Sequence, residues 1–164
     1  MPSETSPLRE YFFRTLHWSL TEQMLLNDEE AESYLADMLV RLMSTEGLYG
    51  VRDEQGRPVH SVPEMLAYGD VRLKADSFAQ EREVHRHVGD FLLFWSGLFP
   101  EGLKRVRAPL IDPVDQGRAS YAIAGSFDHD PYAHEAPILR RLSERFEEFQ
   151  EGLRLARRQI GAIG

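Results

Sequence analysis

Two short segments concentrate the side chains that could do chemistry. The first, EREVHRHVGD at residues 81–90, holds two carboxylate–imidazole pairs four residues apart, Glu81 with His85 and Glu83 with His87. Side chains four apart share one face of a helix, so either pair could hold a divalent metal ion. His85 and His87 themselves lie about 200° apart around a helix and cannot share one ion there. We therefore favour a structural role, in which each imidazole hydrogen-bonds a carboxylate or the backbone at the rim of a buried helix.

The second segment, FDHDPYAHE at residues 127–135, is rich in oxygen and nitrogen ligands of the kind that suit Zn, Mn or Fe. Asp130 before Pro131 is also what the start of a helix requires, and the residues before it are ordinary turn residues. Capping is the favoured interpretation, and a metal-dependent enzyme that joins both segments is the alternative. The candidate ligands in this segment are Asp128, His129, Asp130, His134 and Glu135.

Other catalytic signatures are missing from the sequence. Ser96 lacks the Gly-x-Ser-x-Gly elbow of a serine hydrolase, and no phosphate-binding loop or Gly-x-Gly-x-x-Gly motif occurs. The chain has no cysteine, which excludes a thiol nucleophile, a disulfide framework and cysteine-ligated metal sites. The sequence thus predicts no cofactor.

Aromatic residues offer a third possibility, a pocket for an apolar small molecule or for haem with His17 or His85 as axial ligand. Aromatic side chains at helical spacing more often form an ordinary core, which is the interpretation that we favour. The residues expected in the core or pocket are Phe12, Phe91, Phe94 and Trp95.

The composition is that of a soluble globular domain. The chain has 164 residues, of which 42% are apolar and 28% charged, and its net charge is −8. A nucleic-acid partner is excluded on average charge, since the phosphate backbone would be repelled. The acidity lies in residues 1–82. We see no signal peptide or membrane span and expect a cytoplasmic protein.

Hydrophobic periodicity predicts a compact, single-domain all-α bundle of five major and two short helices over residues 1–164. Residues 46–60 should form a loop with a short hairpin near residues 53–56. Small side chains in the helix expected at 113–126 indicate close helix packing. The major helices are expected at about 7–27, 28–42, 76–96, 113–126 and 131–163, and the short ones at about 61–68 and 100–105.

The first expected helix has apolar side chains on two opposite faces. One face suits the core, whereas Tyr11, Trp18 and Leu25 recur at a spacing of seven on the other. One domain core does not easily cover both faces, so we expect these three residues to contact another helix or a second subunit.

Three segments in the second half of the chain resemble an uncharacterised family of bacterial, mostly helical proteins. They are GDFLLFWSGLFPE at residues 89–101, which has the pattern GDxxLFxxGLFPE, GRASYAIA at residues 117–124, and LSERFEEF at residues 142–149. The resemblance implies a bacterial, cytosolic origin and assigns no role or site. From the residues we expect a non-enzymatic domain that binds a protein partner or itself, with the metal-dependent enzyme and the pocket binder as alternatives.

Overall fold

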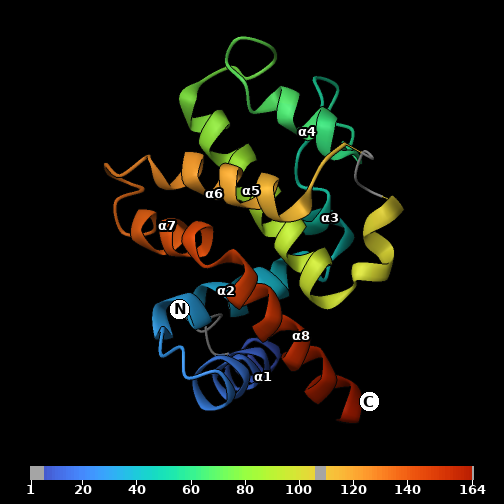
Figure 1. Ribbon diagram of the computed structural model, residues 1–164. Helices are drawn as coiled ribbons and strands as arrows, with labels where there is room; N and C mark the ends of the chain where they lie inside the picture. Colours follow the sequence, from blue (N-terminus) through green and yellow to red (C-terminus); the bar gives the residue numbers. More distant parts are fainter. Residues whose placement is uncertain (1–5, 106–109, 164) are drawn as a thin grey trace.

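The computed structural model describes residues 6–105 and 110–163 and confirms the all-α fold (Figure 1). The described residues contain no β-strand. A single antiparallel bridge between Arg52 and Pro58 closes the turn expected near residues 53–56. The helices are α1 Pro7–Leu16, η2 His17–Gln23, α2 Glu29–Leu42, α3 Thr45–Leu48, α4 Val62–Tyr68, α5 Phe78–Leu98, η3 Pro100–Arg105, α6 Pro113–Gly125, α7 Ala136–Glu144 and α8 Phe146–Ile163.

Helix α5 runs through the middle of the molecule, with α6 beside it and α8 below (Figure 1). Ser77 caps its N-terminus by accepting from the backbone N–H of Gln80. From Val88 to Phe94 every side-chain position is buried, as the nearly continuous apolar sequence predicts for a central helix. The core of the domain is therefore built around α5.

The first expected helix is divided into two parts. The α-helix α1 passes into the π-helix η2 at His17, and Leu25 and Asn27 then adopt positive φ angles of 61° and 51° that end the helical run. The wider turns of a π-helix change the helical phase, so the spacing of seven does not keep one straight face. Tyr11 packs partly against the core, Trp18 is half-buried and Leu25 is 75% exposed.

The prediction of one long C-terminal helix at 131–163 is wrong in two respects. Residues 127–135 form turns, so that Asp130 and Pro131 start no helix and α7 begins at Ala136. The helical path then breaks at Arg145, whose φ and ψ are −115° and 33°. The break has a packing reason, because α7 lies mainly on α6 whereas α8 lies on α5 and on the N-terminal helices.

Helix α6 approaches its neighbours closely where it carries small residues. A Cβ atom on Gly117 would lie 2.4 Å from the ring of Phe146, and one on Gly89 of α5 would lie 2.7 Å from the ring of Tyr121. Both aromatic rings are fully buried. The lack of a side chain at these two glycines thus lets the rings approach the helix backbone closely. Gly117 is one of the small residues of α6 that predict close packing.

Within the described part of the chain, no helix combines the length and the apolar character that a bilayer crossing requires.

Gly117→Ala should therefore destabilise the fold. The added methyl group has to displace the buried Phe146 ring, and overpacking of this kind costs about 1–3 kcal/mol. Urea unfolding measures the loss. Gly161→Ala in α8 is the matched control, because no atom lies within 4 Å of a Cβ at that position. Equal stability of the two variants would contradict the packing described here.

Candidate functional site

The structure places the two histidines of α5 on opposite sides of the helix. Nδ1 of His85 lies 3.1 Å from the hydroxyl of Ser120 in α6, whereas Nε2 of His87 lies 3.1 Å from the carbonyl oxygen of Leu48. Both imidazoles are buried. The backbone hydrogen bond expected at the rim of the helix is found at His87, and neither histidine hydrogen-bonds the glutamate four residues before it.

The carboxylates of this segment also go to different places. Glu81 lines a surface hollow together with His85. Glu83 accepts from the guanidinium groups of Arg82, at 2.6 Å, and Arg86, at 2.9 Å. Neither glutamate thus hydrogen-bonds the histidine four residues after it, and Glu83 is held by two arginines instead.

The ligand-rich segment at 127–135 is exposed and lies in turns. Asp128 faces Arg140 at 3.7 Å, and the ring of His129 contacts Phe127 and Tyr132. His134 and Asp130 are exposed. Across the residues that the structure describes, no three histidine, aspartate or glutamate side chains meet in a geometry that could hold a metal ion. The geometry therefore lends no support to the metal-dependent enzyme.

The aromatic residues expected in the core or pocket belong to the core. Phe12, Phe91 and Phe94 are buried, and Trp95 is partly buried between Phe91 and Phe99. His17 lies 2.9 Å from Glu32, and His85 lies 3.1 Å from Ser120. The four aromatic side chains are thus part of the packed core.

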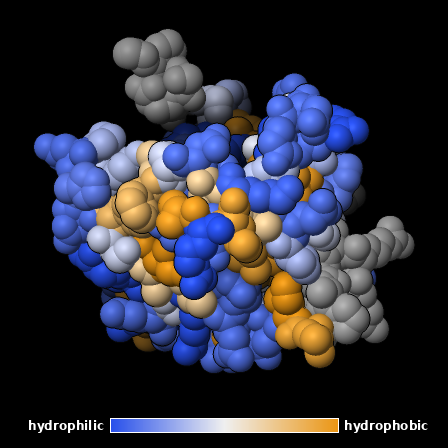
Figure 2. All heavy atoms as spheres, turned by 90° about the horizontal axis from the view of Figure 1, so that it is seen from above, coloured by the Kyte–Doolittle hydropathy of each residue, from blue (hydrophilic) through white to orange (hydrophobic). Residues whose placement is uncertain are grey.

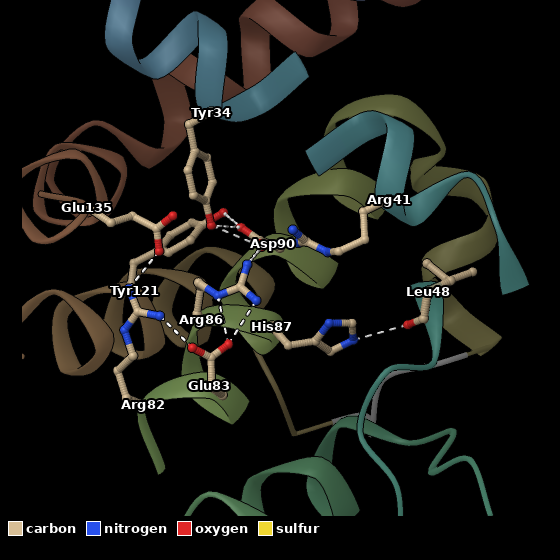
Figure 3. A network of polar contacts seen from close by, with 10 residues as sticks. All are labelled: Tyr34, Arg41, Leu48, Arg82, Glu83, Arg86, His87, Asp90, Tyr121 and Glu135. Atoms are coloured by element: carbon tan, nitrogen blue, oxygen red, sulfur yellow. Dashed lines mark hydrogen bonds and ion pairs between the residues drawn. The ribbon is translucent and has the colours of Figure 1, made fainter. Parts of the chain in front are cut away.

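A fully buried carboxylate, Asp90, lies at the centre of a polar network in the core (Figure 3). Its Oδ1 accepts hydrogen bonds from the phenol groups of Tyr34, at 2.9 Å, and Tyr121, at 2.6 Å. Its Oδ2 accepts from Arg41 and lies 3.4 Å from Nη1 of Arg86. Burial, and after it the nearby Asp90 charge, raises the pKa of both tyrosines well above the usual range, so that both remain hydrogen-bond donors.

The network continues as a chain of ion pairs of alternating sign along α5. Arg86 also binds Glu83, Glu83 binds Arg82, and the buried Arg82 binds Glu135 at 2.6 Å just before α7 (Figure 3). The Tyr132 ring lies 4.4 Å from the Arg82 guanidinium carbon. This chain of ion pairs extends from α2 to the start of α7 and contains three basic and three acidic groups, so that their charges cancel. Their order is Arg41, Asp90, Arg86, Glu83, Arg82 and Glu135.

A cavity of about 920 Å³ opens beside this network. Arg41 and Arg86 lie on its wall next to His87, and the loop after α3 forms the opposite side. Both signs of charge are present around it. The charged lining residues are the basic Arg41, Arg52, Lys74 and Arg86 and the acidic Glu46, Asp53, Glu54, Asp76 and Glu83.

A second buried carboxylate, Glu32 of α2, joins α2 to the π-helix η2. Its oxygens bind Nδ1 of His17, at 2.9 Å, and the hydroxyl of Thr21. The hydrogen bond to Glu32 raises the pKa of His17. π-Helical turns are often found at functional sites. At this junction, however, the carboxylate of Glu32 is used in holding the two helices together.

Apolar side chains gather on the face seen in Figure 2, which views the molecule from above Figure 1. A hollow of about 420 Å³ is lined by Leu66, Val71 and Ile123 together with six small or polar residues, Gly69, Asp70, Arg72, Glu81, His85 and Gln116. Leu73, two residues after Val71, and Phe78, the first residue of α5, are 68% and 65% exposed. Leu73 also lines the cavity beside the Asp90 network. We call the five apolar residues Leu66, Val71, Leu73, Phe78 and Ile123 the apolar face.

Sequence reasoning missed Asp90 and its partners. A signal was present, since Asp90 is a single acid between Val88 and the five consecutive apolar residues 91–95, in a helix expected to be buried. Such an acid needs donors from neighbouring helices. The sequence does not say that they are Tyr34 of α2 and Tyr121 of α6.

Comparisons of this chain with protein families, with curated proteins and with solved structures found no match. The geometry of the chain itself is therefore the basis for a proposal.

The free energy of unfolding should fall between pH 6.5 and 4 because of His87. Burial lowers the pKa of His87 to about 4. The negative charge of Asp90 raises this pKa, whereas the positive charges of Arg41 and Arg86 lower it further. An unfolded histidine has a pKa of about 6.5, so in this window the unfolded chain takes up a proton that the folded chain refuses, at a cost of up to about 3 kcal/mol.

Urea unfolding of His87→Gln at pH 7 and pH 4.5 measures this contribution. The variant should lose less stability than the wild type over this interval. His134→Gln, at an exposed histidine, is the control. If the wild type and His87→Gln lose the same amount, His87 is not held neutral by the fold.

Proposed function

We propose that this chain is a non-enzymatic interaction domain that pairs with a second copy of itself through the apolar face. The observation that carries this proposal is the exposure of Leu73 and Phe78, just before and at the start of α5, together with the hollow to which Leu66, Val71 and Ile123 contribute. Contiguous apolar surface rimmed by polar residues is typical of protein interaction sites.

A second copy is the favoured occupant because one chain carries both an exposed aromatic side chain, Phe78, and a hollow. A two-fold axis places the same surface of both copies in contact, so that the protruding Phe78 of each copy can enter the hollow of the other. The rim of the hollow holds both signs of charge, with Arg72 close to Asp70 and Glu81. A two-fold contact can therefore set Arg72 of one copy against an acidic group of the other, which relieves the repulsion between two chains of net charge −8.

The resemblance to bacterial helical proteins and the lack of cysteine support a setting in a bacterial cytoplasm. The surface at Tyr11, Trp18 and Leu25 is the other candidate for self-association. Leu25 is the most exposed of these three residues, whereas the other two already pack in part within the domain.

Light scattering coupled to size exclusion should show a dimer at micromolar concentration, and Phe78→Glu should shift it to monomer. Loss of a central anchor of an interface costs about 2 kcal/mol or more, which raises the dissociation constant by at least about 30-fold. Met43→Glu, at an exposed methionine outside the apolar face, is the control for an added charge.

Trp18→Glu tests the other surface in the same assay. If Trp18→Glu separates the copies and Phe78→Glu does not, pairing uses the first helix and the proposal is wrong. A wild-type chain that stays monomeric at about 100 μM also contradicts it, since such weak pairing falls outside stable dimers.

A further inference from the structure

The cavity beside the Asp90 network contains an acceptor that no described group of the protein uses. Nε2 of His87 points at the carbonyl oxygen of Leu48, which can only accept, so Nε2 carries the hydrogen. A neutral imidazole then has a bare lone pair on Nδ1. Nδ1 has no hydrogen-bond partner among the described residues, although the side chain is 94% buried.

Gly50 leaves this nitrogen open to the cavity. A Cβ atom at Gly50 would lie 3.7 Å from Nδ1 and 3.6 Å from Cε1 of His87, and both residues line the cavity. Any larger side chain at position 50 would cover the lone pair on Nδ1 of His87. The absence of a side chain thus gives a ligand access to Nδ1.

Arg41 supplies the complementary group on the same wall. Its Nη2 donates to Asp90, and a guanidinium has five N–H donors in all. The side chain is 32% exposed and lines the cavity. Because Asp90 fixes the guanidinium from behind, its remaining donors are held in place for an anionic group, and carboxylate fits the planar fork well.

The charges around the cavity restrict the ligand further. Four basic residues face five acidic ones, so a polyanion such as a nucleotide triphosphate would meet as much repulsion as attraction. A volume of about 920 Å³ accommodates an organic molecule of ordinary metabolite size. Val51, Tyr68 and Val84 add apolar wall for its carbon skeleton.

We propose that this cavity binds an organic carboxylate that also carries a neutral N–H or O–H group. The N–H or O–H group donates to Nδ1 of His87, and the carboxylate binds the guanidinium of Arg41. The cavity and the hollow of the apolar face have no lining residue in common, although Leu73 of the apolar face also lines the cavity. The two groups proposed to hold the ligand, His87 and Arg41, do not belong to the apolar face, so their contacts with the ligand do not require the pairing of two copies.

Hippurate is a suitable probe, because it joins a carboxylate, an amide N–H and an apolar ring. Its N-methyl derivative lacks only the N–H donor. Nitrogen NMR of the chain labelled with ¹⁵N-histidine follows Nδ1 of His87 directly. We expect hippurate to bind with a Kd of about 1 mM or lower and to shift the Nδ1 signal. N-methylhippurate should bind at least about ten-fold more weakly and leave Nδ1 unshifted.

Gly50→Val provides the protein side of the test, with Gly161→Val as the matched control away from the cavity. A Cβ at Gly50 makes only ordinary contacts, the nearest at 3.4 Å, so Gly50→Val should fold, which circular dichroism verifies. Hippurate binding should weaken at least about ten-fold in Gly50→Val and stay unchanged in Gly161→Val.

Three results would overturn the proposal. They are no saturable hippurate binding up to about 10 mM, equal binding of hippurate and its N-methyl derivative, and an Nδ1 signal that does not move in the bound state. If Gly50→Val does not fold, the two probes on the wild-type chain still decide the question.

Discussion

The arrangement of the helices depends on the full burial of one carboxylate, Asp90. A buried charge without partners is far too costly to persist, so the neighbouring helices must bring donors to it. Tyr34 and Arg41 come from α2, Tyr121 from α6 and Arg86 from α5 itself. This requirement fixes how α2 and α6 lie on α5, and Gly89 makes it possible by letting the Tyr121 ring approach the α5 backbone.

The same requirement shapes the surface. Asp90 binds both Arg41 and Arg86, and this fixes their guanidinium groups on the wall of the cavity that His87 also lines. Two residues earlier on α5, His85 faces the opposite side and lines the hollow of the apolar face. The N-terminal half of α5 thus separates two concave surfaces, a cavity lined by nine charged residues and a smaller hollow in which Leu66, Val71 and Ile123 lie among polar groups. One helix positions both candidate sites.

Periodicity in the sequence was sufficient for the fold class and for most helix positions, because burial of apolar faces decides both. Caps such as Ser61 and Asp112 also act where local rules predict. Local rules failed at residues 131–163, where Asp130 and Pro131 suggest a helix start and the packing of α7 and α8 on different partners imposes a break. They failed also at the site, since Asp90, Tyr34 and Tyr121 are far apart in sequence and only packing brings them together.

Urea unfolding of Asp90→Asn tests the central claim most directly. The amide keeps the shape and one acceptor oxygen of Asp90 but leaves Arg41 and Arg86 without the buried charge that binds them. Asp37→Asn is the control, because Asp37 also pairs with an arginine but at the surface. If the buried carboxylate organises the domain, Asp90→Asn should cost about 3–5 kcal/mol, and Asp37→Asn less than about 1 kcal/mol. A loss of less than about 1 kcal/mol for Asp90→Asn would contradict the account.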